Sequence, residues 1–174
     1  KVNAKTVFIL PNNGNIIMAA QQCAHLTEKE IIVIPSKTVP QGITAMMNAD
    51  FECGDPQEMA QAMTASLATV STAQITYAAR DSDFDGFAIH QGDYLALRDG
   101  KLFGTDPDEN ALLRSLAESA AQSDPSFLSL YYGEDVTEEQ AAEASAIFQA
   151  ACPNAELSVL SGGQPVYYYI ISVE

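Results

Sequence analysis

Two short polar segments hold the residues whose types and spacing could bind an anion or a partner. In the first, Pro-Asn-Asn-Gly-Asn at residues 11–15, Asn12 and Asn13 are turn formers and Asn15 is placed to cap a following helix. Backbone N–H groups at such a helix start, together with the helix dipole, could hold an anion. The alternative is a tight capped turn that needs no ligand. The segment is neither a Walker loop nor a GxGxxG turn.

The second polar segment, Pro-Ser-Lys-Thr-Val-Pro-Gln-Gly, covers residues 35–42. Lys37 and Thr38 could both reach the same anion, and Gln41 could point into the same crevice. Pro40 suits the first turn of a helix that begins here. The alternative is a surface loop with an exposed lysine.

No pattern in the sequence predicts catalysis or metal binding. GxSxG, a Ser/His/Asp set, a P-loop and kinase motifs are all absent from the sequence. The two histidines, His25 and His90, fall in different predicted lobes. The three cysteines are widely spaced and form no Cys/His cluster, so neither a disulfide framework nor a zinc site is expected. We therefore assign no catalytic residue and no metal ligand.

Two predicted strands place the polar segments at one edge of a sheet. Residues 6–10 and 30–35 are unbroken apolar runs, typical of parallel strands that are buried on both faces. The apolar face of the helix between them supplies the crossover that two parallel strands require. In an open parallel sheet, ligands meet the protein at the carboxyl ends of the strands, where both polar segments lie. A helix from Pro56 to Val70 carries a methionine-rich stripe that indicates a core.

We expect an α/β fold with two lobes and an α+β second lobe. Residues 1–72 are predicted to form a parallel βαβα lobe. Residues 73–174 are predicted to form a β-meander followed by an αβαββ sequence, as a two-layer sandwich with a mixed sheet and helices on one face. The predicted elements of this lobe are strands at 74–80, 87–90, 94–98, 127–132, 156–160 and 166–173, and helices ending at Ala121 and spanning 138–151.

Composition excludes several classes of partner. The chain has 8 basic and 23 acidic residues, a formal net charge of −15, which argues against a nucleic-acid backbone or an anionic membrane. No apolar run approaches the roughly 18 residues of a membrane span, and no signal peptide is seen, so we expect a cytoplasmic protein. The chain opens at Lys1 without methionine, and we expect it to be a piece of a longer protein.

Five segments across the chain carry a family resemblance: VFILPNNGNIIMAAQQ, IIVIPSKTVPQGI, YAARDSDFDG, LYYGEDVTEEQA and GGQPVYYYIISVE. Together they resemble the C-terminal domain of the bacterial fatty acid kinase A family, also called DAK2-domain or dihydroxyacetone-kinase-like proteins. The resemblance spans essentially the whole chain. It implies a first lobe related in fold to DegV and dihydroxyacetone kinase domains.

The resemblance also implies a function. The segment would be a non-catalytic recognition domain that binds a separate DegV-like fatty-acid-carrier protein. A kinase domain elsewhere in the full-length protein would phosphorylate the bound fatty acid for phospholipid synthesis. ATP and magnesium would belong to that absent domain, so no cofactor is expected here. The matching motifs carry seven candidates for ligand or partner binding: Asn12, Asn13, Asn15, Lys37, Thr38, Gln41 and Gln164.

Two departures from the family pattern limit these expectations. A GGQT-containing segment expected shortly upstream is missing, so we expect the first lobe to be incomplete at its N-terminus. His25 and His90 lie outside the matching motifs, which argues against a hydroxyketone substrate. Two alternatives remain open: a phosphate- or carboxylate-binding domain of a dihydroxyacetone-kinase-like phosphotransferase, and a structural or homodimerising domain.

Overall fold

The computed structural model describes residues 2–84 and 86–174. The chain divides into two compact units, with the division between Val70 and Ser71. The lobe boundary predicted at residue 72 stays a prediction, and Lys1 and Asp85 of the predicted lobes lie outside the described residues. The predicted α/β class with a mixed sheet is confirmed.

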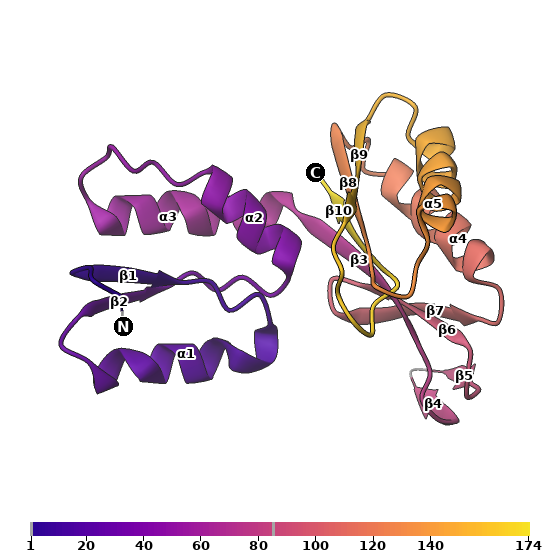
Figure 1. Ribbon diagram of the computed structural model, residues 1–174, viewed down its shortest axis with the longest axis horizontal. Coiled ribbons are helices and arrows are strands. Elements are labelled where there is room, and N and C mark those ends of the chain that lie inside the picture. Colours follow the sequence, from indigo (N-terminus) through magenta and orange to yellow (C-terminus); the bar gives the residue numbers. More distant parts are fainter. Residues whose placement is uncertain (1, 85) are drawn as a thin grey trace. The chain divides into compact units, whose positions relative to one another are not determined.

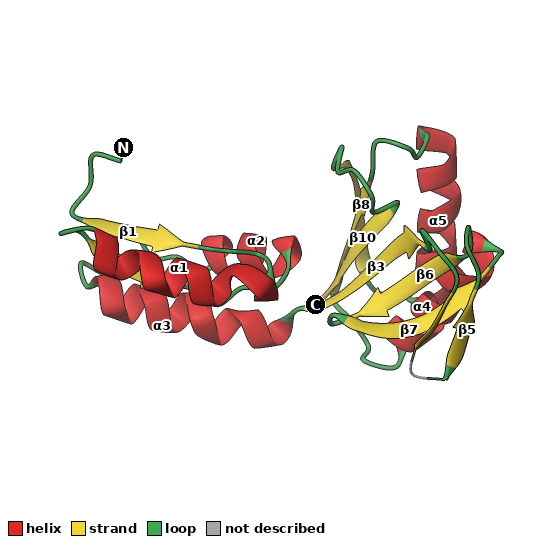
Figure 2. Ribbon diagram, turned by 90° about the horizontal axis from the view of Figure 1, so that it is seen from below, coloured by secondary structure: helices red, strands yellow, loops and turns green. Residues whose placement is uncertain are grey.

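The first unit is a two-stranded parallel sheet with helices on both of its faces (Figure 1). Its elements are β1 (Thr6–Ile9), α1 (Ile17–Cys23), β2 (Glu30–Val33), α2 (Val39–Met47) and α3 (Pro56–Ser66). The pairing runs from Thr6 opposite Glu30 to Ile9 opposite Val33. Helix α1 lies on one face of the strand pair, and α2 and α3 lie on the other (Figures 1 and 2).

A small apolar core fills the space between the strands and the α2–α3 layer. Ile34 and Ala45 are fully buried, and Met63 is 1% exposed. Half-buried Phe8 of β1 packs against this cluster. Met63 and Leu67 face the core because they recur at helical spacing along α3 and the turn that follows it.

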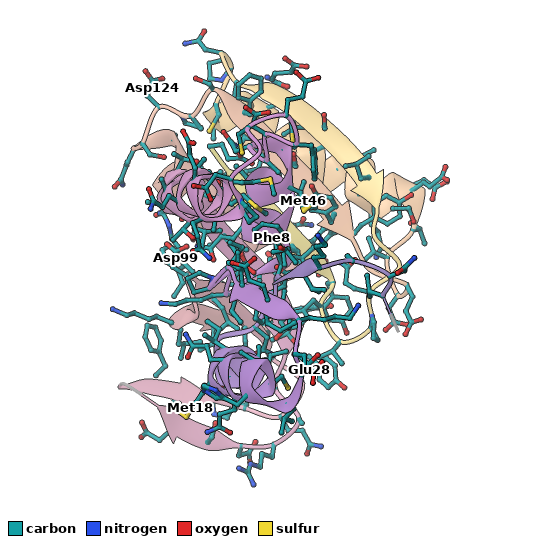
Figure 3. All side chains as sticks on the ribbon, turned by 90° about the vertical axis from the view of Figure 1, so that its left-hand side faces the viewer. Phe8, Met18, Glu28, Met46, Asp99 and Asp124 are labelled. Carbon is teal, nitrogen blue, oxygen red and sulfur yellow. The ribbon has the colours of Figure 1, made fainter. Side chains whose placement is uncertain are left out.

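The opposite face of the strand pair is covered less tightly. No residue of α1 is buried. Met18 lies on the outer side of α1 and is 71% exposed (Figure 3). The apolar positions of α1 therefore give a looser cover than the sequence pattern predicts.

The second unit is built on a six-stranded sheet with the strand order β7-β6-β3-β10-β8-β9 (Figures 1 and 2). Its elements are β3 (Ser71–Tyr77), β4 (Ser82–Phe84), β5 (Phe87–Ile89), β6 (Tyr94–Arg98), β7 (Lys101–Asp106), α4 (Glu109–Ala121), β8 (Phe127–Tyr132), α5 (Glu138–Ala151), β9 (Glu156–Ser161) and β10 (Tyr169–Val173). Strands β4 and β5 form a separate hairpin. Within the main sheet, β8 and β9 are parallel, and the other neighbouring strands are antiparallel.

Helices α4 and α5 pack against one face of this sheet and enclose the main core. Leu113 and Leu116 of α4 and Phe148 of α5 are each 1% exposed. They meet Ile75 and Leu130 from the central strands. Helix α5 begins with a capping box: the Thr137 side chain accepts from the N–H of Gln140, and the Gln140 side chain accepts from the N–H of Thr137. Among the described residues, no helix is long and apolar enough to cross a bilayer.

The last strand begins later than the sequence predicts. The unbroken apolar and aromatic run Val166–Val173 predicts a strand from Val166. The structure instead gives Val166 a φ of 72°, and β10 begins at Tyr169. The N–H of Tyr167 donates to the carbonyl of Pro165 at 2.8 Å, which closes a three-residue turn around Val166.

The start of α4 holds a carboxyl group in an unfavourable setting. Burial raises the pKa of Glu109 above its ordinary value of 4.5, and the neighbouring charge of Asp108 raises it further. The Oε1 atom of Glu109 is buried and has no hydrogen-bond partner within the described part of the chain. The folded unit therefore favours the protonated form of this side chain.

This setting predicts how stability depends on pH. Because the folded-state pKa exceeds the unfolded value, the contribution of Glu109 is fully present below about pH 4.5 and is lost as the pH rises through the folded-state pKa. Glu109→Gln stays neutral, so we expect it to melt at a higher temperature than the parent at pH 7, with less difference at pH 4. Thermal melts from pH 4 to pH 8 measure this. The exposed Glu118 of the same helix supplies the control, Glu118→Gln. Equal pH profiles for parent and Glu109→Gln would contradict the prediction.

Candidate functional site

The candidate site lies where β1 and β2 end and their loops lead into helices. Residues 10–13 connect β1 to a short 3-10 turn (Gly14–Ile16) that precedes α1, and residues 34–38 connect β2 to α2. Because the strands are parallel, both loops follow the carboxyl ends of the strands, on the same side of the unit. A Cβ on Gly14 would lie 3.9 Å from Cγ of Lys37, so the two loops are neighbours.

A hydrogen-bonded pair, Asn12 and Ser36, joins these loops. Asn12 has a φ of 55°, in the left-handed region that asparagine tolerates better than most residues. Its backbone N–H donates to Ser36 Oγ at 3.2 Å, and Ser36 Oγ donates to Asn12 Oδ1 at 2.7 Å. Ser36 is fully buried. The pair fixes both the backbone and the side chain of Asn12.

Helix α2 approaches this pair closely at Gly42. A Cβ built on Gly42 would lie 2.1 Å from Asn12 Oδ1, far inside contact distance. Only glycine therefore allows the first turn of α2 to pack against the Asn12 side chain, which Ser36 holds in place.

The neighbouring asparagines have different roles from those predicted. Asn13 caps the 3-10 turn Gly14–Ile16, because its Oδ1 accepts from the N–H of Asn15 at 2.9 Å. The prediction that Asn15 is the cap is wrong: the helical turn begins earlier, at Gly14, which places Asn15 inside it. The side chains of Asn13 and Asn15 are exposed. Their role in ligand or partner binding stays a prediction.

The loop after β2 is held by its own side chains. Thr38 caps α2, and its Oγ1 accepts from the N–H of Gln41 at 3.3 Å. Gln41 Oε1 accepts from the N–H of Lys37 at 2.8 Å, and Gln41 Nε2 donates to the carbonyl of Leu67 at 3.2 Å. Gln41 thus ties the loop to the end of the α3 segment. Lys37 is exposed and carries the only basic side chain of these two loops.

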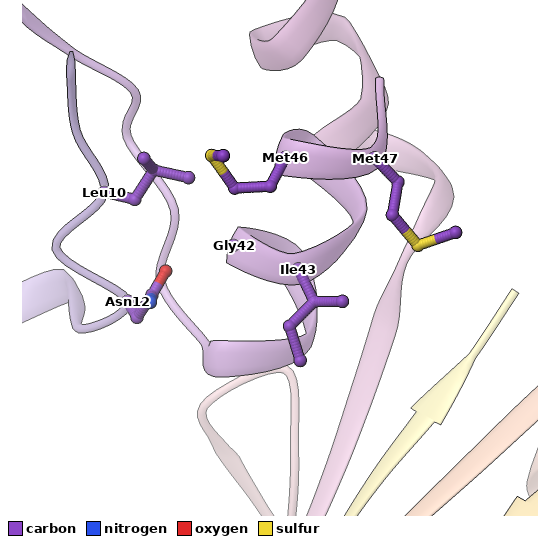
Figure 4. Close-up of a pocket in the computed structure, with 6 residues that line it drawn as sticks. All are labelled: Leu10, Asn12, Gly42, Ile43, Met46 and Met47. Atoms are coloured by element: carbon purple, nitrogen blue, oxygen red, sulfur yellow. The ribbon is translucent and has the colours of Figure 1, made fainter. Parts of the chain in front are cut away.

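Beside Asn12 lies an open pocket of about 520 Å³ (Figure 4). Its lining residues are Leu10, Asn12, Gly42, Ile43, Met46 and Met47. Asn12 supplies the polar side chain of this lining, and the others are apolar or glycine. The pocket can therefore accept an apolar group with a polar end near Asn12.

Sequence reasoning found Asn12 but missed the apolar lining. Ile43, Met46 and Met47 follow one another at i, i+3 and i+4 on α2, and Val39 precedes Ile43 by one turn. The opposite face of α2 buries Pro40, Thr44 and Ala45. The sequence of α2 is apolar on both faces, and this pattern could have indicated that one apolar face stays exposed.

Gln164 belongs to the second unit and is not part of this pocket. Its Nε2 donates to the carbonyls of Tyr131 at 3.1 Å and Tyr167 at 3.3 Å. Its backbone carbonyl accepts from the N–H of Glu134 at 3.1 Å. These bonds hold the loop before β10 against the end of β8.

Within the described ranges, no group of three His, Cys, Asp or Glu side chains is placed to hold a metal ion. The strand ends bring together backbone, amide and apolar groups, and the exposed Lys37 lies in the loop between β2 and α2.

Comparison with a family model decides the family. The model of the C-terminal domain of FakA-like proteins (fatty acid kinase A-like) matches residues 1–174. The chain belongs to this family. Relatives of similar sequence include Protein YloV of Bacillus subtilis (strain 168), which is 36% identical over 177 residues and covers 99% of this chain. An uncharacterized protein of Staphylococcus epidermidis is 33% identical over 170 residues and covers 98% of this chain.

The chain spans only 31% of the length of each of these two relatives. Solved structures show the fold. A DegV family protein of Corynebacterium glutamicum superposes with a TM-score of 0.71 at 16% identity, over 97% of this chain and 75% of that one. The Fak B3 protein of Streptococcus pneumoniae superposes with a TM-score of 0.66 at 12% identity, over 99% of this chain and 72% of that one. The FakA-like domain thus has the fold of DegV family proteins.

These findings correct the resemblance drawn from the sequence. The names DAK2-domain and dihydroxyacetone-kinase-like protein are wrong for this chain, because its fold matches DegV proteins and its family is the C-terminal one. The resemblance rests in part on the short motifs PNN, PSKTVPQG and GGQP. Short segments rich in Asn, Gly, Pro and Ser form turns in many folds, so these motifs could not separate the two groups of proteins.

The cap geometry gives a direct test of the loop. Asn13→Ala removes the acceptor for the N–H of Asn15, and a lost N-cap costs about 0.5–2 kcal/mol of stability. Asn15→Ala removes an exposed side chain that caps nothing, so we expect its melting temperature to match the parent's. Thermal melts of both variants check this, and a larger loss for Asn15→Ala would restore Asn15 as the cap.

Proposed function

We propose that this chain is the recognition domain of a fatty acid kinase and binds a DegV-like fatty-acid-carrier protein. A separate kinase domain of the full-length protein, with its own ATP and magnesium, would then phosphorylate the bound fatty acid in the cytoplasm. Family membership supports the link to this kinase system. The observation that carries the proposal is an exposed apolar surface on α2.

This surface, here called the α2 face, consists of Val39, Ile43, Met46 and Met47. Their exposed fractions are 47%, 38%, 46% and 81%. They fall at i, i+4, i+7 and i+8, on one side of the helix. Contiguous exposed apolar side chains of this kind mark protein or ligand contacts, and flexible methionines adapt to a partner's shape.

The α2 face also lies in the less acidic part of the chain. Residues 1–70 hold four basic and six acidic residues, whereas residues 71–174 hold four basic and 17 acidic residues. Lys37 stands two residues before the α2 face. A partner approaching α2 therefore meets an apolar surface with a cation beside it, and an acidic group on the partner would complement Lys37.

The first test changes the most exposed residue of the α2 face. Burial of the Met47 side chain by the partner would contribute about 1.5–3 kcal/mol to binding, and Met47→Glu replaces that side chain with a charge. We therefore expect affinity to fall roughly tenfold to a hundredfold. Its melting temperature should stay near the parent's, because Met47 is 81% exposed. Calorimetric titration with the DegV-like carrier of the same organism measures the affinity.

Met18→Glu is the matched control, because Met18 is 71% exposed on α1, outside the α2 face. Equal affinities for the parent and both variants would rule out α2 as the docking surface. A carrier that fails to bind the parent chain would overturn the proposed function itself.

The second test concerns Lys37. Charge steering is screened as the Debye length falls from about 30 Å at 0.01 M salt to about 10 Å at 0.1 M. We expect Lys37→Glu to slow association with the carrier most strongly at low salt, with a smaller change in dissociation. Lys5→Glu makes the same charge change at another exposed lysine of the unit. Surface plasmon resonance across salt concentrations compares the two, and identical on-rates would place Lys37 outside the contact.

A second candidate function is that the pocket itself binds a carboxylate or phosphate with an acyl chain. Its apolar lining with Asn12 as the polar end favours this function. Among proteins of the same fold, the structure of Fak B3 is loaded with linoleic acid, and that of a DegV family protein of Eubacterium eligens with heptadecanoic acid. In such a site the acyl chain would lie along Ile43 and Met46, and the head group would meet the Asn12 amide.

Asn12→Asp tests this candidate sharply. The variant keeps the oxygen that accepts from Ser36 but replaces the amide with a negative group, so a carboxylate should be repelled. We expect the affinity for a fluorescent fatty acid to fall at least about tenfold, equivalent to about 1.4 kcal/mol. Asn15→Asp adds the same charge at an exposed site of the same loop. If the parent shows no saturable fatty acid binding, the pocket is not a fatty acid site.

A further inference from the structure

One edge of the six-stranded sheet is a strand that lacks the features by which proteins usually prevent pairing with another chain. β9 is the outermost strand of the six-stranded sheet and pairs only with β8 among the described residues. Its residues from Ser158 to Ser161 are exposed, with Val159 at 39% and Leu160 at 46%. The strand contains no lysine or proline, and its register with β8 runs without a bulge. Such an edge is a template for another strand.

The hydrogen-bond pattern shows which groups this edge offers. The N–H of Glu156 donates to the carbonyl of Ser126, and the N–H of Gly162 donates to the carbonyl of Tyr132, both at 2.9 Å. In a parallel pair, alternate residues bond the neighbour, so the even-numbered residues of β9 face β8. Leu157, Val159 and Ser161 therefore direct their N–H and C=O groups outward.

The opposite edge of the sheet is guarded. β7 begins with Lys101 and ends with Asp106, and its pairing with β6 contains a register shift at Ala96 and Leu97. Charges and bulges of this kind discourage strand addition. β9 carries one charged residue, Glu156 at its start, and no register shift, so it is the more open of the two edges.

The charge around β9 selects the kind of strand that fits. Residues 115–174 contain nine acidic residues and no lysine, arginine or histidine. Helix α5, which packs against β9, carries exposed Glu138, Glu139 and Glu143. A second copy of the chain would bring the same acidic surface against itself, which opposes pairing of two β9 strands. A segment rich in lysine or arginine would instead be attracted.

We propose that the outer edge of β9 binds an extended, lysine- or arginine-rich segment of a partner protein as an added strand. Main-chain bonds to Leu157, Val159 and Ser161 hold the segment, and its basic side chains meet the carboxylates of this half of the unit. The inference concerns β9 alone and does not depend on the function proposed for the α2 face.

The test uses a seven-residue peptide that alternates lysine and valine, and a matched peptide with glutamate in place of lysine. Amide hydrogen exchange of the whole chain is followed by NMR. We expect the basic peptide to slow exchange at Leu157, Val159 and Ser161 by at least tenfold at saturation, and the acidic peptide to leave it unchanged. Equal effects of both peptides, or none of either, would overturn the proposal.

Two variants separate strand addition from general attraction between charges. Val159→Pro removes the central outward N–H without removing a bond to β8, so the basic peptide should no longer protect Leu157 and Ser161. Val159→Lys keeps the backbone N–H and places a cation on the edge, which repels the basic peptide. The protection by the peptide should therefore fall about tenfold in this variant too, which keeps the test valid if the proline variant folds poorly. Unchanged protection in Val159→Lys would contradict the proposal. A chain that forms dimers through β9 without peptide would show that a second copy is the occupant instead.

Discussion

The hydrogen bond from Ser36 to Asn12 is the constraint on which the candidate site depends. It joins the loops that follow both parallel strands, and it fixes the side chain against which α2 packs at Gly42. Because Ser36 is fully buried, loss of the Asn12 side chain would take from its hydroxyl the acceptor at 2.7 Å, at a cost of about 1–3 kcal/mol. The position of α2, and with it the pocket and the α2 face, follows from this pair.

The same constraint explains why the helix exposes apolar side chains. Pro40, Thr44 and Ala45 turn inward toward the small core of the first unit. With that side fixed, Ile43, Met46 and Met47 must point outward, where nothing within the unit buries them. An apolar side chain that folding leaves exposed keeps its hydrophobic free energy available for binding.

Much of the fold could be predicted because it depends on local patterns. The apolar runs around β1 and β2, the Thr38 cap and the Thr137 capping box all act within a few residues. The site could be predicted only in part, since Ser36, Gly42 and Asn12 come from separate segments and meet through tertiary packing. Sequence alone could not choose the cap correctly, because Asn13 and Asn15 have the same chemistry two residues apart. It also placed Val166 in a strand, because a β-branched residue in a left-handed turn is rare.

Charge separates the two surfaces described for this chain. The α2 face belongs to a unit with nearly balanced charge, whereas the β9 edge belongs to a unit with 17 acidic and four basic residues. Salt should therefore affect the two differently. Association at the α2 face depends on ionic strength through one cation, Lys37, whereas attraction of a basic strand to β9 involves many carboxylates and so depends on it more strongly.

Hydrogen exchange of this chain, measured with and without the DegV-like carrier, tests the central claim most directly. We expect slower exchange across Val39–Met47 in the complex, together with residues 11–15 of the adjoining segment. A complex that leaves Val39–Met47 unchanged and slows exchange elsewhere would contradict the assignment of the α2 face as the recognition surface.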